Sequence, residues 1–112
     1  MSKRKLERRQ YKRLKLSCPF AVFNKAGEIL FESKSLNISD GGALLSASIK
    51  HIPPPHAGVK LNFSVPRSTP NSYMMEDFTC PGRVVRQQPL KDDYLAGVAF
   101  QFARPMQLAL EV

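Results

Sequence analysis

The chain has 112 residues, enough for one domain but too few for two independent hydrophobic cores. Hydrophobic residues make up 43% of it, and 17 Lys and Arg against nine Asp and Glu give a net charge of +8. This composition excludes global disorder, its nine prolines argue against a helical bundle, and no apolar run approaches the roughly 20 residues that a membrane span needs.

The positive charge is concentrated at the start of the chain. Residues 1–16 hold eight of the basic residues and a single acid, Glu7, so this segment carries +7 and the remainder only +1. We expect a basic arm over residues 1–15, a folded body over 16–102, and a tail or short helix over 103–112. No long apolar stretch follows the arm, so it does not have the pattern of a secretory signal peptide, and a cytoplasmic location is expected.

Alternation of apolar and polar residues, the pattern of a half-buried strand, recurs along the body. It predicts six strands, at 14–23, 28–39, 43–48, 58–65, 77–87 and 94–102. A bulge near 33–35 would reconcile a change of phase in the second strand, and Val85 falls out of phase in the fifth. Pro19 and Pro81 should lie on strand edges or at bulges.

Turn residues separate these strands. Asp40-Gly41 lies between two apolar runs and predicts a tight hairpin with positive φ at both residues. The segments 51–58, 66–76 and 88–93 are expected to be loops, and Met74 and Met75 in the second are expected to cover an end of the core. An alternative is that this loop contacts a partner protein. Six antiparallel strands in one domain imply an all-β fold, a small barrel or sandwich, and barrel closure would protect the strand edges.

The sequence carries no catalytic or metal-binding pattern. No nucleophile elbow, phosphate-binding glycine loop or paired carboxylates are present, so no enzymatic activity, cofactor or metal site is expected. Cys18 and Cys80 lie on apolar strand faces without CxxC spacing, which predicts two buried free thiols. His51 and His56 flank a run of prolines and lack the spacing of zinc ligands.

Two short motifs carry the functional prediction. Arg8 and Arg9 precede Arg13, and guanidinium groups at this spacing can bind phosphate or the O6 and N7 acceptors of guanine. In the second motif, Asn37 and Ser39 share one strand face beside the hairpin turn, and Gly42 permits a close approach to the backbone. Taken alone, the first motif is better explained as a solvated basic tail and the second as an ordinary hairpin turn.

The order RRxxxR, then NxSxxG, within a small β-barrel resembles the PilZ domain family of bacterial cyclic di-GMP receptors. The segments 82–86 and 95–100 are also similar to the last two strands of that family, so the resemblance covers about residues 8–102. It implies a six-stranded barrel that binds cyclic di-GMP through Arg9, Arg13, Asn37, Ser39 and Gly42. Asn replaces the charged Asp variant of the second motif, which implies a weaker guanine contact.

The resemblance also implies a mode of action. An arginine preceding the RxxxR pair, here Arg8, goes with binding of two intercalated ligand molecules, and the arm would close over them. A monomer that signals to an unidentified downstream protein is expected, acting on motility, exopolysaccharide or other surface behaviour, with no DNA, RNA or membrane insertion. Two alternatives remain: a PilZ-type adaptor without nucleotide, and a small basic barrel that binds RNA or DNA.

Overall fold

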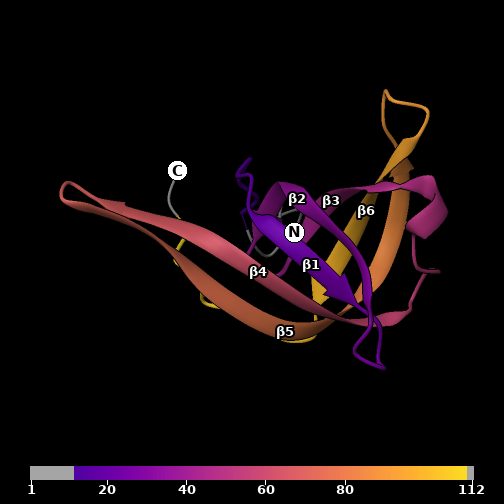
Figure 1. Ribbon diagram of the computed structural model, residues 1–112, viewed down its shortest axis with the longest axis horizontal. Helices are drawn as coiled ribbons and strands as arrows, with labels where there is room; N and C mark the ends of the chain where they lie inside the picture. The colour runs from indigo at the N-terminus through magenta and orange to yellow at the C-terminus, as the bar shows by residue number, and fades with distance from the viewer. Residues whose placement is uncertain (1–11, 111–112) are drawn as a thin grey trace, which may run out of the picture.

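The computed structural model describes residues 12–110, and its strands form one closed antiparallel barrel (Figure 1). Going around the barrel the order is β1-β2-β3-β6-β5-β4, and β4 returns to pair with β1. A single short 3-10 helix, Ile49–His51, follows β3 in this part of the chain. The predicted all-β six-stranded fold is confirmed. The strands are β1 (Pro19–Phe23), β2 (Ile29–Ser39), β3 (Gly42–Ser48), β4 (Gly58–Thr69), β5 (Ser72–Pro89) and β6 (Leu95–Phe102).

The barrel interior is filled by the apolar phases of the six strands. Phe63 lies at its centre: its ring stacks on Phe20 at 4.6 Å between centroids and on Phe102 at 5.4 Å. Leu61, Val84 and further aliphatic residues around these rings are fully buried. Tyr94, the first residue of the strand predicted at 94–102, instead precedes β6 and is 78% exposed.

Two bulges explain the changes of phase in the sequence. The pairing of β2 with β3 shifts between Ser35 and Asn37, which leaves Leu36 as the extra residue, one position beyond the expected range, and exposes its side chain. The pairing of β5 with β6 shifts between Val84 and Arg86, so Val85 is the extra residue there.

The predicted hairpin at Asp40-Gly41 is present, but its turn geometry differs from the expectation. Ser39 pairs with Gly42 across a two-residue connection. Within residues 12–110, positive φ is confined to Gly27, His56 and Ala109, so neither turn residue has it. Hydrogen bonds from the carboxyl-terminal segment to Asp40 hold this turn instead.

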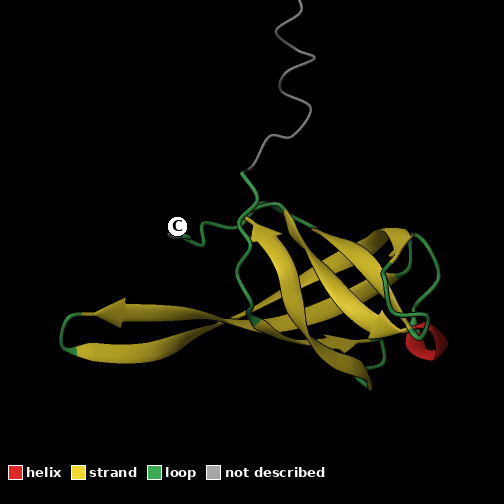
Figure 2. Ribbon diagram, turned by 90° about the horizontal axis from the view of Figure 1, so that it is seen from above, coloured by secondary structure: helices red, strands yellow, loops and turns green. Residues whose placement is uncertain are grey.

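The segment 66–76 was expected to be a loop, and this expectation is wrong. It is the outer half of a long β4–β5 hairpin with its turn at 70–71, which extends well beyond the barrel (Figures 1 and 2). Because β1 pairs with β4 only as far as Phe63, and β6 with β5 only from Gly82, the two strands pair only with each other beyond those points. Met74 is 56% exposed and Met75 38% exposed, so neither covers the core.

Both ends of the described chain differ from expectation. The first strand begins at Pro19 rather than at 14, because Leu14 pairs elsewhere. No helix forms after Pro105: residues 103–110, which we call the carboxyl-terminal strap, run without regular structure to the mouth of the barrel, where Leu108 is fully buried. Helices long and apolar enough to cross a membrane do not occur among residues 12–110.

Candidate functional site

One backbone pairing joins the two sequence motifs. Leu14 donates its N–H to the carbonyl of Ile38, and Ile38 donates its N–H to the carbonyl of Leu14, each at 2.9 Å. This isolated antiparallel bridge places Arg13, the last arginine of the first motif, next to the middle of the second motif. Ile38 is fully buried, so its neighbours Asn37 and Ser39 alternate to the opposite face of β2.

The arginines are described only in part. Arg13 is exposed on the segment that leads into the Leu14 bridge. Arg8 and Arg9 lie outside the described residues, so the structure does not place them. Of the predicted ligand-binding residues, the structure therefore places Arg13 and the three residues of the second motif.

Asn37 is the residue of the second motif that remains available to a ligand. It follows the bulge at Leu36, is partly exposed, and its side-chain amide hydrogen-bonds to nothing within residues 12–110. An amide offers two donor hydrogens and an acceptor oxygen, which can match the edge of a purine base.

Ser39 has a structural role in the turn. Its hydroxyl accepts a hydrogen bond from the N–H of Gly41 at 3.1 Å and lies 3.4 Å from the carbonyl of Gly42. Its side chain is 7% exposed. A hydroxyl has two acceptor lone pairs, so one remains after the Gly41 contact. Sequence reasoning placed this hydroxyl on the surface and missed its use within the turn.

Gly42 is required by the neighbouring strand. A Cβ atom at this position would lie 2.2 Å from the carbonyl oxygen of Phe100 and 3.2 Å from Cα of Gln101. The close approach that the sequence indicated is therefore already made by β6, with which Gly42 pairs. Packing against β6 is therefore enough to explain why a glycine stands at this position.

The strap supplies contacts that the sequence did not indicate. Met106 donates its N–H to the carbonyl of Asp40 at 2.8 Å, and Leu108 donates its N–H to Oδ1 of Asp40 at 3.0 Å. Phe102, at the end of β6, donates to the carbonyl of Gly41 at 2.9 Å. Because these partners lie more than 60 positions along the chain, no local pattern around Asp40 could have revealed them.

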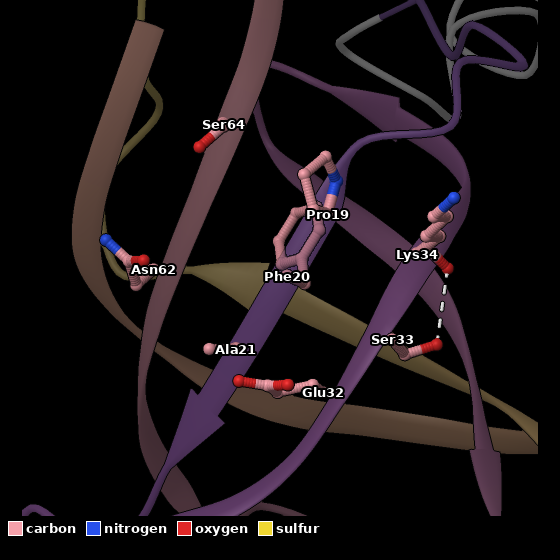
Figure 3. A pocket seen from close by; sticks show the side chains of 8 residues that line it. All are labelled: Pro19, Phe20, Ala21, Glu32, Ser33, Lys34, Asn62 and Ser64. Carbon is pink, nitrogen blue, oxygen red and sulfur yellow. Dashed lines mark hydrogen bonds between the residues drawn. The ribbon is translucent and has the colours of Figure 1, made fainter. Parts of the chain in front are cut away.

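The described part of the chain has a hollow that does not coincide with the motifs. It lies on the outer face of the barrel across β1, between β2 and β4 (Figure 3), and none of the motif residues lines it. Lys34 is its one cation, and Glu32 lies on the same strand, so the hollow lacks the converging positive charge that a bound phosphate favours. Its lining residues are Pro19, Phe20, Ala21, Glu32, Ser33, Lys34, Asn62 and Ser64.

The two thiols are buried and unpaired, as expected. Burial raises the pKa of Cys80 to about 11. Burial also raises the pKa of Cys18, although the hydrogen bond with Ser35 and the charge of Arg67 act in the opposite direction. The thiolate form needed for nucleophilic or metal chemistry is disfavoured at both positions. No group of three or more His, Cys, Asp or Glu among residues 12–110 is arranged to hold a metal ion.

Comparison with known proteins gives the family. The sequence matches the PilZ domain over residues 7–111, nearly its whole length. The chain belongs to the PilZ domain family. The closed barrel and the order of the two motifs in this PilZ domain agree with that match.

A solved structure supports the PilZ fold independently. The Bacillus subtilis inhibitor of motility, MotI/DgrA, is similar with a TM-score of 0.72 and 16% sequence identity. The match covers 88% of this chain and 44% of that one, so the chain spans less than half the length of this neighbour. Among curated proteins, the sequence search gives no match.

Proposed function

We propose that this PilZ domain is a bacterial receptor for cyclic di-GMP that acts as an adaptor without catalytic activity. The observation that carries the proposal is the Leu14–Ile38 pairing, because it brings Arg13 next to the second motif, opposite Ser39. The Arg13 guanidinium and the Asn37 amide, on two paired segments, can match the phosphates and guanine edges of a cyclic dinucleotide. Family membership supports the same ligand.

In the proposed mechanism, the basic arm of residues 1–15 closes over the ligand. Arg13, with Arg9, binds phosphate or guanine acceptors, while Asn37 holds a base from the barrel surface. The remaining lone pair of Ser39 can accept one further hydrogen bond. Gly42 contributes by keeping the turn against β6. Arg8 would add a contact to a second, intercalated ligand molecule.

Signalling follows from the surface that arm, ligand and barrel form together. A downstream protein would recognise this surface, with effects on motility, exopolysaccharide or other surface behaviour. The proposal includes a monomer in the cytoplasm, and the unpaired state of Cys18 and Cys80 is the one usual in a reducing compartment.

Isothermal titration calorimetry with cyclic di-GMP, with GTP as the control nucleotide, tests the proposal. We expect saturable binding of cyclic di-GMP, near two molecules per protein if Arg8 supports an intercalated pair, and no comparable GTP binding. One molecule per protein would keep the receptor function and remove the role inferred for Arg8. Absence of binding by a folded sample at low salt would instead favour the ligand-free adaptor.

Competition with RNA separates the proposal from a general nucleic-acid binder. A receptor should keep its cyclic di-GMP stoichiometry in the presence of long RNA, whereas a polyanion binder should prefer the RNA. Raising the salt concentration should weaken cyclic di-GMP binding, because arginine–phosphate contacts are screened. An affinity that does not respond to salt would count against those contacts.

A further inference from the structure

A single strap residue is bonded to two separate parts of the barrel. Leu108 donates its N–H to Oδ1 of Asp40 at 3.0 Å, and its carbonyl accepts a hydrogen bond from Nη2 of Arg67. The Leu108 side chain is fully buried in the core cluster, so its backbone has little freedom to shift while the barrel stays closed. Asp40 and Arg67 are thus connected through one immobilised residue.

At the first end of this connection, the strap holds the turn of the second motif. Asp40 receives two hydrogen bonds from the strap, one at its carbonyl from Met106 and one at its side chain from Leu108. The same turn contains the Ser39–Gly41 contact. The strap therefore adds two hydrogen bonds to a turn that β6 also holds, through Phe102 and the pairing of Gly42.

At the second end, Arg67 holds the strap against the projecting part of the β4–β5 hairpin, where Arg67 pairs with Met74. Its Nη1 donates to the carbonyl of Ala109 at 2.9 Å, and its Nε donates to Oε1 of Glu76 at 2.9 Å. Ala109 has a φ of +52°, a conformation that alanine rarely adopts, and its carbonyl is bound by Arg67 there. One guanidinium therefore links both hairpin strands to two consecutive strap carbonyls.

The sheet itself provides no direct connection between these two ends. β4, which carries Arg67, pairs with β1 and β5, whereas the turn at Asp40 joins β2 and β3. The strap crosses from one to the other at the mouth of the barrel.

We propose that Asp40 and Arg67 are positioning residues for the ligand motif, acting on each other through Leu108. The inference rests on the proposed cyclic di-GMP site and deepens it: ligand binding at Asn37–Gly42 is coupled to the projecting part of the β4–β5 hairpin. Loss of Arg67 releases the carbonyls of Leu108 and Ala109, loosens the strap, and lowers the fraction of molecules whose turn is in the binding geometry. A reduction in affinity of about five- to tenfold is expected, within the usual range for coupled sites.

The coupling can be tested first without ligand, by amide NMR on the full chain. Arg67→Gln is compared with Arg83→Gln, a matched control that also removes one positive charge, but whose guanidinium hydrogen-bonds, among residues 12–110, to the side chain of Gln101 alone, at 2.9 and 3.2 Å. Arg67→Gln should shift the amide signals of Asp40 and Gly41 and accelerate hydrogen exchange at Leu108, and Arg83→Gln should do neither. Unchanged signals at Asp40 and Gly41 in Arg67→Gln would overturn the proposal.

Calorimetric titration with cyclic di-GMP then tests the effect on binding. Arg67→Gln and Asp40→Ala should each weaken binding about five- to tenfold, and the double variant should bind no more weakly than the weaker single variant. Multiplied losses in the double variant would contradict a shared route through Leu108.

Arg67→Lys separates positioning from charge and serves if Arg67→Gln does not fold. Lysine keeps the positive charge but lacks the planar fork that reaches both strap carbonyls. It should therefore bind about as weakly as Arg67→Gln, and binding equal to the original protein would overturn the positioning role. If the original protein binds no cyclic di-GMP, the proposed function has failed, and the ligand-free comparison alone still decides whether Arg67 positions the turn.

Discussion

Leu14 and Ile38 exchange both of their backbone hydrogen bonds, so the end of the basic arm is fixed to the strand that carries the second motif. A basic segment alone would bind anions without selectivity, and an Asn-Ser hairpin alone would be an ordinary turn. The reciprocal pairing brings the end of the first motif next to the second, because its antiparallel register puts Arg13 opposite Ser39 and Lys15 opposite Asn37. The proposed ligand site depends on this pair of residues.

Replacement of Arg13 tests the arginine side of the site. Arg13→Ala should weaken cyclic di-GMP binding by about 10- to 100-fold, the equivalent of about 1.5–3 kcal/mol for a hydrogen bond to a charged group. Because the side chain is exposed, the melting temperature should stay near that of the original protein. Arg83→Ala is the control for general loss of charge, and calorimetry gives both affinities. Binding that survives Arg13→Ala unchanged would show that the site is misplaced.

Gly42→Ala tests whether this glycine is needed by the fold itself. The added Cβ would collide with the carbonyl of Phe100, a backbone atom that cannot move without displacing β6. We expect a loss of about 1–3 kcal/mol in the free energy of unfolding. The melting temperature should fall by at least about 4 °C.

Gly58→Ala is the matched control for that experiment. A Cβ at Gly58 meets only the flexible end of the Lys25 side chain, at 2.8 Å from Cε, and Gly58 does not have positive φ. It should leave the melting temperature nearly unchanged. Equal effects of the two substitutions would mean that contact with β6 does not explain Gly42.

The sequence predicted those features of the fold that depend on residues close together in the chain. The hairpin at Asp40-Gly41 and the phase change at Val85 are encoded within a few residues, so alternation and turn chemistry were sufficient. The contact of the Ser39 hydroxyl with Gly41 is local too, and the preference of serine for such turns could have indicated it, but the prediction considered only the strand face.

The helix predicted after Pro105 and the loop predicted at 66–76 are both absent because of tertiary contacts. Residues after Pro105 have a helix-compatible start, yet burial of Leu108 and the hydrogen bonds to Asp40 and Arg67 hold them in an irregular path over the barrel mouth. The prolines and polar residues of 66–76 suggested a loop, although pairing of β4 with β5 continues through Pro66. Long-range partners of this kind leave no periodic signal.

The exposed end of the β4–β5 hairpin gives a stability prediction. Tyr73 is 68% exposed and Met74 56% exposed, so replacing both with serine removes little buried surface. The free energy of unfolding should change by no more than about 0.5 kcal/mol. Phe63→Ala, in the core, is the contrasting control and should cost about 3–5 kcal/mol. A large loss in the serine variant under chemical denaturation would mean that the hairpin end packs on the barrel after all.

The buried thiol of Cys80 predicts a loss of stability at alkaline pH. Below its ordinary pKa of 9.0 the thiol is protonated in both the folded and unfolded states and has no effect on their balance. Between pH 9 and about 11 the Cys80 thiol ionises in the unfolded chain but stays protonated in the folded protein, so the free energy of unfolding falls as pH rises.

Urea unfolding of the original protein and of Cys80→Ala across this range measures the effect. Lysines and tyrosines also titrate there, so the informative quantity is the difference between the two pH profiles. The variant should lose less stability than the original protein between pH 9 and pH 11. Parallel profiles would show that the Cys80 thiol ionises equally in both states.

The most direct test of the central claim is amide NMR during titration with cyclic di-GMP, because it locates the site as well as detecting binding. We expect the largest shifts at Arg13, Leu14 and the segment 37–42, with the hollow across β1 largely unaffected. Shifts concentrated instead at Phe20, Glu32 and Lys34, or none at all in a folded sample, would contradict the claim that the Leu14–Ile38 pairing forms the ligand site.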